Sequence, residues 1–528
     1  MNNTSNKNII DITFIGSGIS TSFTLIALLE SLQGHSSSAK PLKIALIERD
    51  PEFFTGLAYG PRSGSSALLI TSLADFLPEG PVRDEFISWL NLNKKELLDE
   101  LKHDGGDLSL NWIRTHRDEI EAGDWLDIYI PRRFFGKYIR EKVEKVIRET
   151  EKQFPVELIY IQEEVIRVHE KGTGFELEFL SDSENLFSEK VVVSVGIPPV
   201  NTYWDPEDEA RYAEQACLIR NPYSTGLSNN LDKIESYLAK RNDPSNVLII
   251  GANASAMEMI YKLNDRPGIR YRLGKFKIVS PQGELPNSAQ DDFTRMVKFI
   301  PENLLALRNN EKLTAWDIYK AANLDLDAAE HRDFGTAISE TPISTAFLSL
   351  LGKLDDQELK SFACHYGNEI GKRQRRAGKH YTDIVDHLMA QNRINNIKGY
   401  FNGISPGDHH DGVIFEYRND NGKLTKTHPE PVHLLISCAG AKTLENKPLT
   451  SLLEQLMADG LCKPNPSKRG FIVDNKMQAV PGLFISGPLL AGNVINGVPY
   501  WHLEHCGRII ALSKALGNEL FEVIRVRK

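Results

Sequence analysis

The sequence predicts an α/β fold with two dinucleotide-binding, Rossmann-like domains, the second inserted in the first, and a largely helical extension. Near the N-terminus, "IIDITFIGSGIST" runs an apolar strand into a glycine turn and a helix, and "VLIIGANASAMEMI" repeats this pattern from residue 247. A long, mainly helical stretch follows the second pattern, and strand patterns return in the last third of the chain. Strand, tight turn and helix in this order are the outline of a dinucleotide site.

The composition supports a globular protein of two or three domains. The chain has 528 residues, of which 41% are hydrophobic and 25% are charged. Its net charge of −9 is spread along the chain and gives no support to a nucleic-acid surface. No apolar run is long enough to span a membrane, and the N-terminus has no apolar signal core. The five cysteines are far apart and include no C-x-x-C motif, so we expect reduced thiols and a cytoplasmic protein.

The first unit begins with strands at 9–15 and 42–48 around a helix at 19–32. Its remaining pattern predicts helices at 83–101 and 134–150 and strands at 156–169, 175–180 and 190–199. The second unit continues with a strand at 276–280 and helices to about 395. Later patterns predict strands at 397–404, 412–418, 432–438 and 482–487 and a helix at 499–516. We therefore expect FAD-type segments at 1–225 and 396–528 around a NAD(P)-type segment at 226–395.

The first glycine turn has the residues that a dinucleotide needs. Gly16 permits a tight turn, and Gly18 lets the backbone approach a pyrophosphate at the helix N-terminus, where Ser20 is a further candidate contact. Thr21 holds the position of the small residue that packs helix against strand. Glu48 ends the second strand, where a carboxylate can accept the hydroxyl groups of an adenosine ribose. The alternative is a plain βαβ turn with a surface glutamate.

Three later strands also end in a small residue and a glycine. "VVVSVGIPP" contains Gly196, "LLISCAGAK" ends a strand near 438, and "GLFISGP" ends at Gly487. Such turns bring a strand end close to a bound cofactor. Spread over the whole chain, these features resemble the flavoproteins with two dinucleotide-binding domains, in which both ends of the sequence hold FAD.

Four further segments narrow the resemblance. "GLAYG" (56–60), "DEFISWL" (84–90), "YIPRRFFGKYI" (129–139) and "RNPYS" (220–224) are similar to signature segments of the bacterial FAD/NAD(P)-binding protein family, which is related to amino-acid N-hydroxylating flavin monooxygenases. The resemblance implies FAD contacts at Gly16, Gly18, Thr21, Glu48, the backbone near Val165, and Gly487. Where the family often has "LLN" beside the flavin, this chain has "LLITS", so Thr71 or Ser72 stands in place of Asn.

The second turn, "GANASAMEM", resembles the NADPH turn of flavin monooxygenases. It keeps Gly251, Ser255, Ala256 and Glu258, but Asn253 stands where the second glycine is expected. Asn tolerates a left-handed backbone and is a good helix N-cap, so the turn and its helix should form. Its side chain either donates to a phosphate or blocks one.

The next strand ends without a cofactor-selecting charge. Ser280, Pro281 and Gln282 hold the turn where an NADH site has an acid and an NADPH site has a basic residue. A basic run, "GKRQRRAGK" at 371–379, could supply a cation for a 2′-phosphate or a substrate carboxylate. The alternative is a solvated helix face.

Three other groups of residues need an interpretation. "GDHHDG", with His409 and His410, is more typical of a hairpin turn than of a metal site, so we expect no metal. His502, in "PYWHLEHCGRI", is either a packed helix residue or a group that acts on the flavin end of the site. Arg132, in "YIPRRFFG", either contacts FAD or substrate, or forms a structural ion pair.

The leading hypothesis is an FAD-dependent, NAD(P)H-consuming monooxygenase that uses O2 to hydroxylate a small polar metabolite, such as an amino-acid amine. FAD supplies the chemistry, so His502 and Asn253 are the only side chains that we single out as catalytic candidates. One alternative is a flavin oxidase or dehydrogenase that does not use NADPH. Another is a non-catalytic flavin- or nucleotide-sensing protein with the helical stretch as its partner surface.

Overall fold

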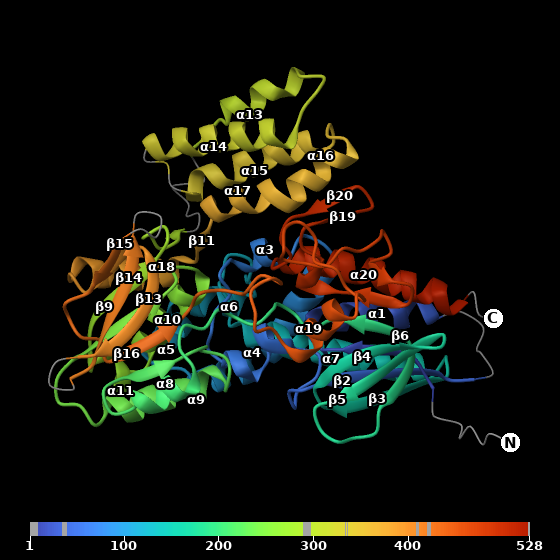
Figure 1. The fold of residues 1–528 in the computed structure, drawn as a ribbon, viewed down its shortest axis with the longest axis horizontal. Helices are drawn as coiled ribbons and strands as arrows, with labels where there is room; N and C mark the ends of the chain where they lie inside the picture. The colour runs from blue at the N-terminus through green and yellow to red at the C-terminus, as the bar shows by residue number, and fades with distance from the viewer. Residues whose placement is uncertain are drawn as a thin grey trace.

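Two sheet-containing units lie side by side, and a layer of helices covers the junction between them (Figure 1). The computed structural model describes residues 9–33, 40–288, 297–332, 334, 336–407, 411–419 and 424–525. The two units and the helical layer confirm the predicted α/β fold with a helical extension.

The first sheet has the strand order β17-β18-β6-β1-β2-β3, and a hairpin of β4 and β5 extends it from β6. Its strands are β1 (Ile10–Ile15), β2 (Leu42–Glu48), β3 (Val156–Gln162), β4 (Val165–Lys171), β5 (Gly174–Phe179), β6 (Leu186–Val193), β17 (Gln478–Val480) and β18 (Leu483–Ile485). The central strand β1 is almost entirely buried, because helices cover both faces of a parallel sheet. β17 and β18 come from the end of the chain, so the first unit closes only with the C-terminal segment.

The second sheet has the order β12-β9-β8-β16-β7, and all of its strands are parallel. They are β7 (Cys217–Ile219), β8 (Ser245–Ile250), β9 (Leu273–Ser280), β12 (Ile394–Lys398) and β16 (Leu434–Ser437). All five lie between β6 and β17 in the sequence, which confirms that the second unit is inserted in the first. The expected bounds of 226–395 are too narrow, because β7 and β16 both pair within the second sheet.

Short strands complete the second unit and its surroundings. β13 (Tyr400–Pro406), β14 (Val413–Asn419) and β15 (Leu424–Thr427) form an antiparallel sheet between β12 and β16, and β10 (Asn287–Ser288) pairs with β11 (Arg376–Ala377). The beginning of the segment 396–528, which was expected to close the first unit, is therefore a crossover within the second unit that ends at β16, and only the later part of that segment joins the first unit.

Four long helices and several shorter ones belong to the first unit. They are α1 (Ile19–Leu32), α4 (Pro81–Asp104), α7 (Arg132–Glu151) and α20 (Cys506–Arg525), with the shorter α2 (Gly56–Tyr59), α3 (Leu73–Phe76), α5 (Asp107–Thr115), α6 (Arg117–Ala122) and α19 (Ser451–Ala458). α1 packs against both α7 and α20. α1 is buried along almost its whole length, so it is the central helix of this unit.

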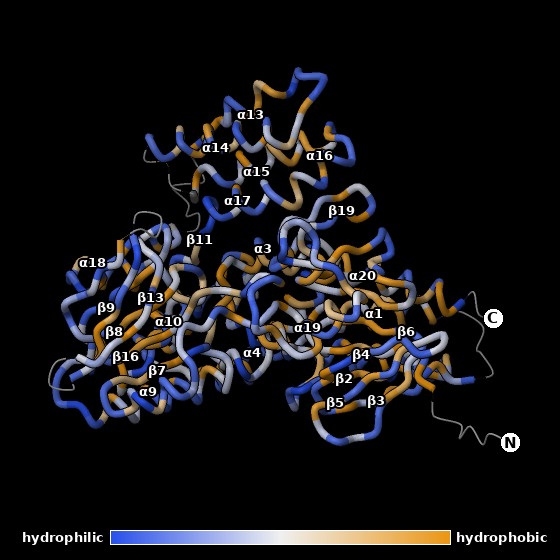
Figure 2. Tube along the Cα trace, viewed as in Figure 1, coloured by the Kyte–Doolittle hydropathy of each residue, from blue (hydrophilic) through white to orange (hydrophobic). Residues whose placement is uncertain are grey.

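The remaining helices belong to the second unit and to the helical layer. α8 (Pro206–Arg211), α9 (Leu227–Leu238), α10 (Ala254–Asp265), α11 (Pro267–Arg270) and α18 (Lys379–Ala390) flank the second sheet. The layer consists of α13 (Glu302–Ala306), α14 (Ala315–His331), α15 (Thr336–Leu351), α16 (Asp356–Ser361) and α17 (Gly367–Arg373). The layer has its own apolar core, which includes Trp501 from the C-terminal segment. Figure 2 shows apolar residues along the strands and the inner faces of helices, and hydrophilic residues on the outer loops.

The end of the chain differs from its predicted helix. The predicted helix 499–516 begins only at Cys506, because β19 (Asn493–Ile495) and β20 (Val498–Tyr500) form a hairpin before it. Asn496 and Gly497 both have positive φ, at 50° and 77°, as the two central residues of a type I′ hairpin turn require. The Asn-Gly pair is the sequence signal that the helix prediction overlooked.

Over the described residues, no helix combines the length and the apolar character that crossing a membrane would require. All five cysteines are free and buried.

The glycine of the second turn gives a test of the fold. Gly251 has a φ of +103°, and a Cβ there would lie 2.3 Å from the carbonyl oxygen of Cys438. We expect Gly251→Ala to destabilise the protein by roughly 3 kcal/mol, because it combines backbone strain with a clash against backbone. Gly460 has a φ of +74° with nothing within 4 Å of its Cβ position, so Gly460→Ala should cost only about 1 kcal/mol. Thermal unfolding of both variants checks this, and equal midpoints would contradict it.

Candidate functional site

The first glycine turn lies at the carboxyl end of β1, where the main chain of β6 presses against it. Gly16 has a φ of +93°, and a Cβ there would lie 2.4 Å from the carbonyl oxygen of Ser194. The Gly16 N–H donates to Ile47 O, and the Ser194 N–H donates to Ile15 O, both at 2.8 Å. Only glycine fits at this position. The Thr21 hydroxyl donates to Gly16 O at 2.6 Å and so ties the start of α1 to the turn.

Glu48 ends β2 beside this turn. Its Oε2 accepts the Ser17 N–H at 2.8 Å, and its Oε1 accepts the Asp50 N–H at 3.1 Å. Burial raises the pKa of the Glu48 carboxyl, while these two N–H groups partly oppose the rise. A buried carboxylate with spare lone pairs suits the hydroxyl groups of a ribose better than it suits a structural role without a ligand.

The other predicted contacts of the first unit meet at the same edge. Gly487 has a φ of +73°, and a Cβ there would lie 2.6 Å from Ser20 Oγ at the start of α1. Gly196 has a φ of +78° with no atom within 4 Å of its Cβ position. α1 begins after Gly18 with no side-chain cap on its N–H groups. An open helix N-terminus, a buried carboxylate and free space beside Gly196 fit a dinucleotide, with its pyrophosphate at α1.

Two further predicted contacts lie close to this edge. Val165 begins β4 and is buried, and it follows Glu163, whose N–H donates to Glu48 O at 3.0 Å. Thr71 lies just before α3, and its neighbour Ser72 caps that helix by accepting the Asp75 N–H. The "LLITS" segment thus uses its serine for a helix cap and leaves Thr71 half-buried beside it.

The second turn repeats the backbone geometry of the first. The Gly251 N–H donates to Val279 O at 2.8 Å, and the Cys438 N–H donates to Ile250 O at 2.7 Å. These bonds match those of Gly16 and Ser194, so the two turns are built alike. The register also places Ser280 of β9 where Glu48 of β2 stands in the first unit. The second turn therefore lacks the ribose carboxylate of the first.

Asn253 is the N-cap of α10. Its Oδ1 accepts the Ser255 N–H at 3.2 Å, as the cap prediction requires. Its φ of −106° is extended, so the left-handed backbone that we allowed for is not used, and Gly251 supplies the positive φ instead. The side chain occupies the end of the helix where a phosphate would approach the N–H groups. Ser280 Oγ accepts the Gly283 N–H at 2.9 Å and so belongs to its own turn.

Arg132 joins the two units through a buried ion pair. Its two terminal nitrogens each lie 2.9 Å from an oxygen of Glu258 on α10, and the Tyr223 hydroxyl donates to the same carboxylate at 2.7 Å. Burial alone would lower the pKa of Arg132, but the Glu258 carboxylate outweighs it and raises the pKa. Of the two interpretations of Arg132, a cofactor or substrate contact and a structural ion pair, the structure shows the ion pair. Its partner, Glu258, was not predicted from the sequence.

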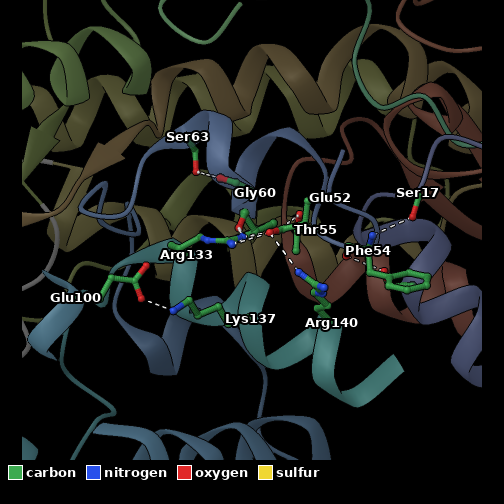
Figure 3. Close-up of polar contacts among 12 residues, drawn as sticks. Ser17, Glu52, Phe54, Thr55, Gly60, Ser63, Glu100, Arg133, Lys137 and Arg140 are labelled. Carbon is green, nitrogen blue, oxygen red and sulfur yellow. Dashed lines mark hydrogen bonds and ion pairs between the residues drawn. The ribbon is translucent and has the colours of Figure 1, made fainter. Parts of the chain in front are cut away.

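Arg133 makes a second link, within the first unit (Figure 3). Its guanidinium holds Glu52, with Nη2 at 2.7 Å from Oε2, and it also donates to the Tyr59 carbonyl at 3.2 Å. Thr55 donates to Glu52 as well, and Arg140 lies 3.5 Å from it. Burial opposes ionisation of Glu52, yet Arg133 holds the pKa of that carboxyl below its usual value. These contacts fix the "GLAYG" segment on α7, directly beside the first turn.

His502 lies in the loop before α20, not on the helix where we expected it. Its Nδ1 lies 3.1 Å from Nη1 of Arg508, and the Arg508 guanidinium stacks over the Trp501 ring at 4.4 Å. Burial, followed by the charge of Arg508, lowers the pKa of His502 to about 3. His502 is therefore neutral at any physiological pH. Sequence reasoning missed Arg508, although it follows His502 in the same segment.

Comparisons with known proteins agree with this geometry. The model of the FAD-NAD(P)-binding family matches residues 13–198. Residues 13–198 form an FAD/NAD(P)-binding domain. An uncharacterized protein of Mycobacterium tuberculosis is 28% identical to this chain over 526 residues, which cover 97% of this chain and 95% of that protein. The match to the FAD-NAD(P)-binding family model confirms the expected class of cofactor.

Solved structures share the fold over nearly the whole chain. The FAD-bound cadaverine monooxygenase DfoA from Erwinia amylovora superposes with a TM-score of 0.51 at 13% identity, over 97% of this chain and 94% of that one. Ornithine hydroxylase PvdA from Pseudomonas aeruginosa gives a TM-score of 0.48 at 16% identity, over 98% of this chain and 100% of that one. The likeness to DfoA covers the fold of the inserted second unit as well as that of residues 13–198.

The basic run after the helical layer is mostly neutralised by its own neighbours. Arg373 pairs with Asp327 and Glu330, Arg376 with Glu340, Lys372 with Glu369, and Lys379 with Asp383. Arg375 alone in this run has no carboxylate partner in the described residues, and it lies close enough to contribute to the lowered pKa of His502. The predicted hairpin residues His409 and His410 lie outside the described residues.

The Arg132–Glu258 pair can be tested by removing one partner at a time. We expect Arg132→Gln and Glu258→Gln each to destabilise the protein by about 3–5 kcal/mol, because each leaves a buried charge or polar group without its partner. Arg211 forms an exposed pair with Asp208, so Arg211→Gln is the matched control and should leave thermal unfolding unchanged. If Arg132→Gln behaves like Arg211→Gln, the pair does not hold the two units together.

Proposed function

We propose that this protein is an FAD-dependent, NAD(P)H-consuming monooxygenase that hydroxylates a small polar amine with O2. The observation that carries the proposal is the pair of dinucleotide turns with the same backbone geometry in one chain, around Gly16 and Gly251. A chain with one such turn needs only one nucleotide. A second turn joined to the first by the Arg132–Glu258 pair supports a reaction in which one dinucleotide reduces the other.

The residues of this chain would hold the two cofactors as follows. Gly16, Gly18, Ser20 and Glu48 suit FAD, Gly196 leaves room beside it, and Gly487 packs closely against Ser20. Gly251 and Ser255 suit the nicotinamide dinucleotide. FAD, when bound, supplies the chemistry of hydride acceptance and oxygen transfer, and the protein positions the reactants and excludes water.

An amine is the substrate class that we favour. The signature segments resemble those of proteins related to amino-acid N-hydroxylases, and the similar structure from Erwinia amylovora is that of a cadaverine monooxygenase. The second candidate is a flavin oxidase that does not use NADPH. The cap formed by Asn253 and the absence of a carboxylate at Ser280 favour it, because both weaken the case for a nicotinamide cofactor.

Reduction of the bound flavin separates these candidates. We expect NADPH added to the FAD-loaded protein without oxygen to bleach the visible flavin absorbance before any substrate is added. NADH should do so more slowly, because Ser280, Pro281 and Gln282, at the end of β9, offer no acid to bind its ribose. Bleaching by an amine but not by NADPH would favour the oxidase, and a protein that cannot be loaded with FAD would overturn both functions.

Asn253 gives a sharper test of the second turn. Asn253→Gly removes the side chain and frees the Ser255 N–H, while glycine remains an acceptable N-cap. We expect the apparent Kd for NADPH to fall about tenfold, which corresponds to roughly 1.4 kcal/mol, with FAD binding unchanged. Asn253→Asp keeps the cap but brings a negative charge to the phosphate position, so it should weaken NADPH binding. Stopped-flow reduction at varied NADPH concentrations measures both variants.

If neither substitution changes the NADPH affinity, this turn does not contact the nicotinamide cofactor.

A further inference from the structure

Three arginines approach one histidine between the C-terminal segment and the end of the helical layer. Arg508 lies 3.1 Å from Nδ1 of His502 and stacks on Trp501, while Arg469 donates to the Trp501 carbonyl at 3.0 Å. Arg375, which follows α17, is close enough to contribute to the lowered pKa of His502. We call Arg375, Arg469, Arg508 and His502 the arginine cluster.

In the part of the chain that the structure describes, no carboxylate forms an ion pair with any arginine of this cluster. Among the acidic residues, Glu369 has the largest electrostatic effect on the pKa of Arg469, but its carboxylate is paired with Lys372 at 2.7 Å. Glu504 also acts on Arg469 and forms no ion pair with it. By contrast, Arg132 pairs with Glu258 and Arg133 pairs with Glu52. The cluster is therefore an unneutralised concentration of positive charge.

The electrostatics of the cluster agree with its geometry. Burial lowers the pKa of both Arg469 and Arg508, whereas the carboxylate-paired Arg132 has a raised pKa. The Nε of Arg469 is buried and has no hydrogen-bond partner in the described residues. A buried, unpaired N–H on a cation costs free energy unless a ligand completes it. These groups together lack an acceptor with negative charge.

His502 adds a donor to the cluster. Arginine has no acceptor atom, so Nδ1 of His502 must accept from Arg508 and carry no proton. The low pKa of the imidazole keeps it neutral, and its proton is therefore on Nε2, where it can be donated. Guanidinium groups and a neutral imidazole N–H are donors that suit a carboxylate or a phosphate.

The cluster is connected to the cofactor edge of the first unit. His505, three residues after His502, lies with its Nε2 3.1 Å from the carbonyl oxygen of Asp75 in α3. α3 follows the "LLITS" segment, and α20 begins directly after His505 and packs along α1. The cluster is part of neither glycine turn, so it is available to a third ligand.

We propose that the arginine cluster binds the acidic group of the substrate, a carboxylate or a phosphate. The identification of the ligand as the substrate rests on the proposed function. Anion binding at the cluster, however, can be tested without enzyme turnover. The substrate would then be an amine that also carries a negative charge, which the cluster holds at a fixed distance from the flavin edge.

The test is anion binding by the FAD-loaded protein. Thermal unfolding is measured in inorganic phosphate and in acetate, each against chloride at equal ionic strength. The expected result is a midpoint that rises with anion concentration in the wild type. Arg469→Gln and Arg508→Gln should each reduce the apparent affinity at least tenfold. Each shift is compared with the same variant in chloride, so a loss of basal stability does not affect the comparison.

Arg373→Gln is the matched control, because Arg373 lies beside the cluster in sequence but is already paired with Asp327 and Glu330. This variant should keep the wild-type anion response. A response to phosphate alone would identify a phosphorylated ligand, and a response to both anions would identify a carboxylate as sufficient.

The proposal is overturned if the wild type shows no shift beyond the chloride control, or if Arg469→Gln and Arg508→Gln keep the full response. These outcomes are independent of the proposed function, since NADPH can bleach the flavin whether or not the cluster binds an anion. Conversely, anion binding at the cluster without reduction of the flavin by NADPH would overturn the NADPH-dependent function and leave the anion site supported.

Discussion

The buried contact between Arg132 and Glu258 links α7 of the first unit to α10 of the second. Burying charges costs free energy. The attraction within this pair offsets that cost only because both oxygens of the carboxylate are aligned with both terminal nitrogens of the guanidinium. Tyr223 donates to the same carboxylate and narrows the geometry further. Since Arg132 begins α7 and Glu258 lies near the start of α10, the ion pair holds the N-terminal ends of these two helices against each other. An apolar contact would hold the units together with less directional control.

The two turns show that the same backbone can carry different recognition chemistry. Gly16 and Gly251 meet a carbonyl at nearly the same distance and make equivalent hydrogen bonds. Their differences lie in side chains: the first turn has Gly18 and the carboxylate of Glu48, and the second has the cap of Asn253 and the hydroxyl of Ser280. The first unit offers an open helix end to a phosphate, while the second already satisfies one of its N–H groups. At the end of β9 the hydroxyl of Ser280 therefore stands in place of the carboxylate that ends β2.

Local sequence was sufficient for much of the fold. The strand–turn–helix units followed from hydrophobic period and glycine position, and the helix at 19–32 and the strand at 42–48 have the predicted ends. Strand partners were less accessible, because the pairing of β16 with β7 and with β8 depends on contacts far apart in sequence. The final helix was misplaced because an apolar pattern outweighed the Asn496-Gly497 turn. For the site, residue types predicted the turn around Gly16 and the cap at Asn253. The partners of Arg132 and His502 could not be predicted, since each comes from packing of side chains that sequence order does not reveal.

Trp501 has a consequence for the order in which the protein folds. Its indole is buried in the core of the helical layer, in contact with Phe347 and Phe362. During synthesis, α13 to α17 emerge well before this residue, so the layer must wait with an incomplete core until the C-terminal segment arrives. β18 likewise joins β6 only at the end. Such distant pairings slow folding and leave apolar surface open in the meantime. The nascent chain is therefore most exposed to aggregation, and to chaperones, just before the segment that carries β18 and Trp501 is added.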